Sequence, residues 1–154
     1  YLAALQRYMD EGISRTVKRN AEMSPEAALR ETLEFVAQLS SAPAGEKGCF
    51  TIAAASELLP GDEEVKGKVS FKFNRLINEL ENILKRGQDQ RVFRQDEDAR
   101  VMAQSIFMML EGMRIYGKLQ PAIGDLRKSN DFIVRTILSD THDVTGNSAV
   151  KASA

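Results

Sequence analysis

The chain has 154 residues, 43% of them apolar and 28% charged, which is enough to bury the core of one globular domain. Its formal net charge is −1 and its Lys and Arg residues are scattered, so the chain by itself is a poor candidate for binding nucleic acid through clustered cations. A single cysteine excludes an internal disulfide and is compatible with the cytoplasm. No apolar run is long enough to predict a membrane-spanning helix, so we expect no membrane among the partners.

Apolar residues recur at helical spacing along most of the chain, and no two segments read as pairing strands. The pattern therefore predicts an all-α fold, a six-helix bundle domain over residues 1–140 followed by a flexible tail at 141–154. The predicted helices are 1–20, 25–40, 49–59, 62–90, 96–119 and 123–139.

Polar and special residues mark several helix ends. Ser24 is suited to cap the second helix with Pro25 as its first residue, and either Asp96 or Asp98 begins the fifth. We expect Gly87 to mark the fraying end of the fourth helix, and Phe93, with its neighbour Val92, to plug the polar connection that follows.

The segment 96–119 is apolar almost all round, more than the single stripe that a surface helix needs. It must be covered both by the chain's own helices and by a partner subunit or a ligand, unless it is an ordinary core helix of a monomer. Together with 123–139, it predicts a homodimer with Gly112 near the symmetry axis. The residues assigned to the dimer interface are Ser105, Met109, Gly112, Met113, Tyr116, Asn130, Ile133 and Ile137.

The sequence offers no set of residues suited to catalysis. Its one histidine, His142, falls in the predicted tail, and Cys49 opens an apolar segment, so we expect a buried, inert thiol. No Gly-rich phosphate loop or pair of Glu-x-x-His motifs is present. We therefore expect no enzyme activity, no metal site and no cofactor.

Aromatic and Met residues gather in the middle three helices and could line an adaptable cavity or simply fill the core. They are Phe50, Phe71, Phe73, Met102, Phe107, Met108 and Met113, and the polar residues among them are Asn74, Asn78, Glu111 and Arg114. Because Glu111 and Arg114 are three residues apart, a local ion pair is their favoured interpretation. The ligand-binding set that we predict is Phe50, Phe73, Met102, Phe107, Glu111 and Arg114.

Three segments in this order form a wider pattern: GCF at 48–50, SELLPGDEEVKGKV at 56–69, and LKRGQDQRVFRQDEDARVMAQSIFMMLEGMRIYGKL at 84–119. Their order and spacing resemble the C-terminal domain of TetR/AcrR-type transcriptional repressors. The resemblance covers about residues 1–140, and it is the combination of segments, rather than any one of them, that is specific.

The resemblance implies a ligand-sensing and dimerisation domain whose last two helices form a four-helix bundle with those of the partner. Operator DNA would be bound only through an N-terminal helix-turn-helix head, which is missing here, with 1–20 as the connecting helix. A small apolar or amphipathic effector would release the DNA. The alternative is a free-standing helical dimer that serves as a structural or assembly module.

Overall fold

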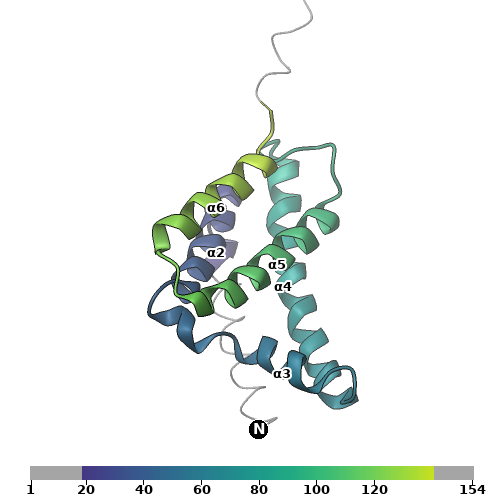
Figure 1. The fold of residues 1–154 in the computed structure, drawn as a ribbon. Coiled ribbons are helices and arrows are strands. Elements are labelled where there is room, and N and C mark those ends of the chain that lie inside the picture. Colours follow the sequence, from purple (N-terminus) through teal and green to yellow (C-terminus); the bar gives the residue numbers. More distant parts are fainter. Residues whose placement is uncertain (1–18, 141–154) are drawn as a thin grey trace, which may run out of the picture.

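The computed structural model describes residues 19–140, which fold into helices and their connections (Figure 1). The described part enters on the last turn of a helix at 19–21, and the rest of the predicted helix 1–20 and the tail 141–154 lie outside it. The prediction of an all-α, six-helix fold is confirmed. The elements that follow are α2 (Pro25–Ser40), η1 (Ala44–Lys47), α3 (Phe50–Leu58), α4 (Glu63–Asp89), α5 (Ala99–Tyr116), η2 (Gly117–Leu119) and α6 (Ile123–Ile137).

Side-chain caps fix the starts of α2 and α5, as expected from the sequence. The Ser24 hydroxyl accepts a hydrogen bond from the backbone N–H of Ala27 at 3.3 Å, with Pro25 in the first turn of α2. Asp98, rather than Asp96, caps α5, and its carboxylate accepts from two backbone N–H groups at 2.8 and 3.0 Å. Each cap satisfies backbone donors that have no partner inside the helix.

Two helices share the centre of the bundle. Helix α5 packs against α4 and α2, and α2 in turn contacts α4, α5 and α6, so that α6 covers α2 on its outer side (Figure 1). The segment 96–119 is therefore central, as the sequence predicts, but α2 is equally so. The largest fully buried side chains of this main core are Leu29, Leu33, Ile83, Leu84, Phe93, Ile106 and Val134.

A second, smaller apolar cluster lies where α3 packs on the first turns of α4. Its buried members are Ala54, Val65 and Val69. Phe73, one turn further along α4, packs against both this small cluster and the main core. The apolar interior of the described chain thus consists of separate parts, and Phe73 lies between two of them.

Gly87 does not fray, which corrects our expectation. It is buried in the last turn of α4, and a Cβ atom there would lie 1.9 Å from the Phe93 ring. The backbone N–H groups of Val92 and Phe93 both donate to the Gly87 carbonyl, at 2.8 and 3.2 Å. The glycine therefore makes room for Phe93, which is 0% exposed and forms the predicted plug.

Helix α6 ends at Ile137, two residues before the predicted boundary at Ser139. The chain beyond it is extended and pairs with the connection between α4 and α5. The Arg94 N–H donates to the Ile137 carbonyl at 2.8 Å, and the Ser139 N–H donates to the Val92 carbonyl at 2.9 Å. These contacts to a distant segment end the helix earlier than its own apolar pattern indicates.

Candidate functional site

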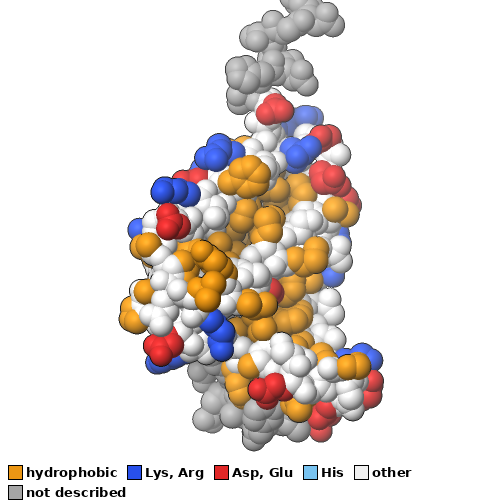
Figure 2. Space-filling view, viewed as in Figure 1, with side chains coloured by type: hydrophobic (Ala, Val, Ile, Leu, Met, Phe, Trp, Pro, Cys, Tyr) orange, Lys and Arg blue, Asp and Glu red, His pale blue; other side chains and the backbone are white. Residues whose placement is uncertain are grey.

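Helix α5 has two apolar faces, and they meet different surroundings. The inner face packs into the chain's own core through Met102, Ala103, Ile106, Phe107, Leu110 and Met113. The outer face is exposed, and Figure 2 shows apolar side chains spread over the surface that α5 and α6 share. The exposed large apolar residues of α5, the following turn and α6 are Val101, Met108, Met109, Ile115, Tyr116, Leu119 and Phe132.

The predicted dimer-interface residues divide between these two surroundings. Ser105, Met109, Gly112 and Tyr116 are exposed on the outer face of α5, as the prediction requires. The other four predicted residues are buried within the chain, so the structure does not present them to a partner. They are Met113, Asn130, Ile133 and Ile137.

Asn130 and its neighbours on α6 face inward because α6 packs its apolar stripe against α2. The Asn130 side-chain amide donates to the Leu33 carbonyl at 3.0 Å in a fully buried contact between the two helices. Ile133 and Ile137 belong to the main core. The outer apolar face of α6 is supplied instead by Phe132, which the sequence analysis did not select.

Among the predicted ligand-binding residues, Phe73 on α4 and Phe107 on α5 contact each other. Their ring centroids are 5.0 Å apart and their planes are inclined by 60°. Phe107 is buried and Phe73 half-buried, whereas Met102 lies within the main core. Phe50 is half-buried in the first turn of α3, beside the small apolar cluster. The structure thus brings together two aromatic residues of the predicted ligand-binding set.

Other members of the predicted cavity point outward, which corrects the prediction. Phe71 and Met108 are among the exposed large apolar residues. Asn74 and Asn78 are also exposed, and the Asn78 side-chain oxygen accepts from Arg100 at 2.5 Å on the surface. These four residues do not line the interior between α3, α4 and α5.

Arg114 does not form the expected ion pair with Glu111 in the described part of the chain. Its buried guanidinium donates to two backbone carbonyls, that of Leu39 and, at 2.5 Å, that of Gly48. Leu39 lies in the last turn of α2, where helix carbonyls have no partner within the helix. Arg114 therefore fastens the end of α2 and the turn before α3 to α5.

Glu111 is left with an unmet hydrogen-bonding requirement. Its Oε2 atom is buried and has no hydrogen-bond partner within residues 19–140. Burial raises the pKa of the Glu111 carboxyl, while the positive charges of Lys72 and Arg114 act in the opposite direction. One side-chain oxygen each of Asn20, Ser40 and Asn130 is in the same situation, but the Glu111 atom belongs to an ionisable carboxyl, for which burial without a donor costs more.

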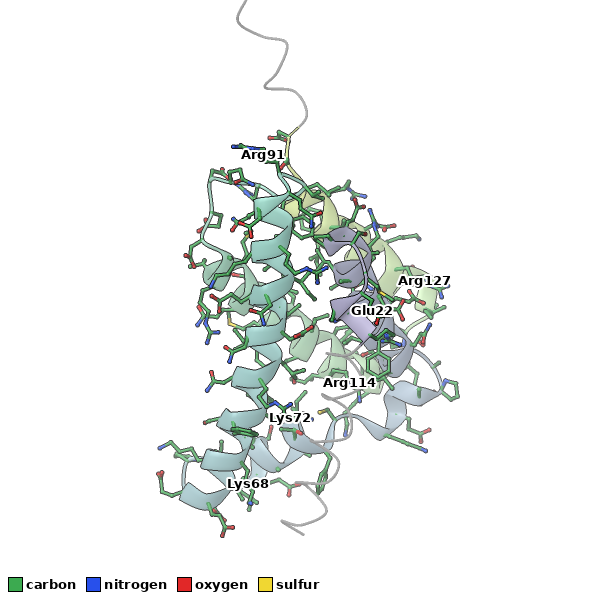
Figure 3. The ribbon with its side chains drawn as sticks, turned by 180° about the vertical axis from the view of Figure 1, so that it is seen from behind. Glu22, Lys68, Lys72, Arg91, Arg114 and Arg127 are labelled. Atoms are coloured by element: carbon green, nitrogen blue, oxygen red, sulfur yellow. The ribbon has the colours of Figure 1, made fainter. Side chains whose placement is uncertain are left out.

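Lys72 reaches the same region from α4. Its ammonium group donates to the hydroxyl of Thr51, which is fully buried on α3, at 2.8 Å. Burial lowers the pKa of Lys72, whereas Cys49 and Glu111 raise it. Figure 3 shows Lys72 and Arg114 lying near each other. We call Thr51, Lys72, Glu111 and Arg114 the polar cluster.

The sequence analysis missed Thr51 and Lys72, although one signal for Lys72 was available. It is three residues after Val69 and four before Leu76, within the apolar stripe of α4, where a charged side chain is out of place. Thr51 carries no comparable signal. Cys49, at the start of α3, is half-buried rather than fully buried as expected.

Residues 25–127 match the family described as Tetracyclin repressor-like, C-terminal domain. The chain belongs to this family. Among solved structures, the fold is similar to that of E. coli NemR in its reduced form, with a TM-score of 0.76 and 14% sequence identity over 90% of this chain and 73% of that one. A search of curated proteins found no match.

No helix within residues 19–140 is long and apolar enough to cross a membrane. No three His, Cys, Asp or Glu side chains in this range are grouped so that they could hold a metal ion.

Proposed function

We propose that this chain is the effector-sensing and dimerisation domain of a TetR-like transcriptional repressor. A small apolar or amphipathic molecule, bound between α3, α4 and α5, would release operator DNA from a head that precedes the 154 residues. Membership of the family supports the role of a regulator's C-terminal domain.

The observation that carries the proposal is that α5 is apolar on both faces. Its inner face meets the Phe73–Phe107 pair and ends at the polar cluster, and its outer face is left exposed by the chain. Exposed apolar area of this extent, crossing two neighbouring helices, is typical of a surface that binds another protein. Helix α5 would then connect the effector site to the dimer interface, so that a displacement of α5 by the effector would also move the interface residues.

The proposal is tested on the purified chain by two measurements. Sedimentation over a range of concentrations should show a dimer, and a thermal-shift screen should find apolar or amphipathic compounds that raise the melting temperature. A ligand that binds only the folded state adds about 2.7 kcal/mol of stability at a hundredfold excess over its dissociation constant.

The two measurements separate the proposal from its alternative. A dimer that no compound in a broad panel stabilises would favour the structural or assembly module. A monomer at every concentration would contradict both functions. Stabilisation of a dimer by apolar compounds would support the sensing domain.

A further inference from the structure

The polar cluster interrupts an otherwise apolar interior. On one side lies the main core, which includes Phe107, and on the other lies the small cluster under α3. The half-buried Phe73 contacts both. A ligand that enters here meets aromatic rings and charged or polar side chains together.

The hydrogen bonds of the polar cluster leave one of its buried atoms without a partner. Arg114 donates to the carbonyls of Leu39 and Gly48, and Lys72 donates to Thr51. Glu111 Oε2 is the buried side-chain atom of the cluster that has no partner within residues 19–140. The group that would complete the cluster is therefore a hydrogen-bond donor.

The charges of the cluster select the kind of donor. Lys72 and Arg114 place two positive charges close enough to Glu111 to influence its ionisation. A cationic ligand would be repelled by both. An anionic ligand would be attracted by both but has no proton to donate, so it would leave Glu111 Oε2 without a partner. An uncharged hydroxyl avoids both penalties, because it can donate to Glu111 and accept from a nearby cation.

The spacing along α5 selects the body of the ligand. Phe107 and Glu111 are four residues apart on the same helix face, which is slightly more than one turn or about 6 Å along the axis. Phe107 contacts Phe73 with an inclined ring geometry, which is an arrangement that aromatic rings prefer. A benzene ring beside this pair would hold a ring hydroxyl close to the Glu111 carboxyl.

We infer that the effector belongs to the class of neutral phenols, with its ring against Phe73 and Phe107 and its hydroxyl donating to Glu111 Oε2. This inference rests on the proposed function, because it names the chemical class bound at that same site. It further specifies that the polar group of the ligand is uncharged and is a donor.

The test uses probes that share one apolar body and differ in the polar group: propylbenzene, 4-propylphenol, 4-propylbenzylamine and 4-propylbenzoate. Dissociation constants for the whole chain are measured by titration calorimetry and thermal shift near neutral pH. The phenol should bind about tenfold more tightly than propylbenzene, because a hydrogen bond to a charged group contributes more than one to a neutral group. The amine and the carboxylate should bind more weakly than the phenol.

Glu111→Leu should abolish the preference for the phenol while propylbenzene still binds. The matched control is Glu57→Leu, which makes the same change at an exposed glutamate of α3 and should leave the preference unchanged. If Glu111→Leu does not fold, Glu111→Gln serves in its place. The amide keeps an acceptor without charge, so the preference should fall to about threefold.

Each other outcome decides between the inference and the function beneath it. Equal binding of phenol and propylbenzene, or a preference that survives Glu111→Leu, overturns the phenol assignment but leaves an apolar effector site. Tightest binding of the amine or the carboxylate likewise overturns the assignment. If none of the probes binds, and the broad panel also fails, the sensing function itself is wrong.

Discussion

Gly67 and Gly87 lie on the same helix in opposite environments. A Cβ atom at Gly67 would have no atom within 4 Å, because this side of α4 is open. A Cβ atom at Gly87 would overlap the ring of Phe93. Since Phe93 is fully buried and the connection between α4 and α5 is folded around it, the ring has no free space into which to move.

Alanine substitution at these two glycines should therefore have opposite effects on stability. Gly67→Ala should raise the free energy of unfolding by up to about 1 kcal/mol, because alanine favours a helix over glycine. Gly87→Ala should lower it by about 1–3 kcal/mol through overpacking, in spite of the same gain in helix propensity. Urea unfolding of both variants measures the difference, and a stabilised Gly87→Ala would show that Phe93 is not packed as described.

The residues of the candidate site show which contacts a sequence pattern can predict. Phe73 and Phe107 were predicted because each continues an apolar stripe, and α4 and α5 pack these stripes together. The contact between Lys72 and Thr51 depends on how α3 lies on α4, which no periodicity contains. Arg114 was assigned to a local partner, but the carbonyls at the end of α2 provide acceptors that become visible only once the helices are packed.

At the scale of the elements, polar contacts join α2 and α6 both in the interior and at the surface. Inside, Asn130 donates to the Leu33 carbonyl. At the surface, the Arg127 guanidinium binds the Glu34 carboxylate, with its shortest contact at 2.6 Å. The hydrogen bond from Arg127 is the largest cause of a lowered pKa at Glu34. This pair makes part of the contact between the two helices dependent on pH.

The sign of that dependence follows from the direction of the shift. A carboxyl whose pKa is lower in the folded state adds stability above its unfolded pKa, about 4.3 for a glutamate, and loses it as the pH falls through the folded pKa. Arg127→Gln should therefore destabilise the chain at pH 6 and cost progressively less as the pH falls below about 4.3. The effect should be small and weakened by salt, because the Arg127 side chain is exposed and that of Glu34 is still partly exposed.

Urea unfolding between pH 6 and pH 3 measures this difference, with Arg135→Gln as the control on the same helix. Arg135 is also exposed, and its loss should give a difference from the original chain that varies less with pH. An Arg127→Gln difference that stays constant across this range would show that the pair does not couple α2 to α6 in solution.

The helix starts were better predicted than the helix ends. Ser24 and Asp98 each accept a hydrogen bond from a backbone N–H in the first turn of the helix that they cap. The local sequence is therefore enough to predict where these helices begin. The end of α6 is set by the segment around Val92 and Arg94, more than forty residues earlier in the chain. Side chains of Gln88 and Gln95 hold that segment through its backbone carbonyls. Such tertiary contacts override the apolar period that predicted a longer α6.

At the scale of the molecule, the outer face of α5 is an apolar surface that the packing of residues 19–140 leaves exposed. Charged side chains of both signs surround it, while apolar residues occupy its middle (Figure 2). The all-round apolar pattern of 96–119 predicted apolar surface beyond the face that meets the core, and no helix within residues 19–140 covers it. The pattern could not tell which residues of α6 face outward, since that depends on the rotation of α6 against α2.

Gly112 gives the sharpest test of the proposed dimer. It lies on the exposed face of α5, and a Cβ atom there would meet nothing within 4 Å in the single chain. Met109 and Tyr116, three residues before it and four after, are exposed on the same face. In a symmetric dimer any contact on this face occurs twice, so a side chain added near the axis meets its own copy.

Gly112→Leu should therefore stabilise the single chain and weaken the dimer. The free energy of unfolding at high dilution should rise by about 0.8 kcal/mol, because leucine favours a helix over glycine. The dimer dissociation constant should rise about tenfold, since overpacking costs about 1–3 kcal/mol. Gly67→Leu is the matched control, as it also adds a side chain at an open position, but on α4. Sedimentation equilibrium measures the dimer dissociation constant of each variant. Gly67→Leu should leave the dimer unchanged, and a Gly112→Leu dimer as tight as the original would place the interface on another surface.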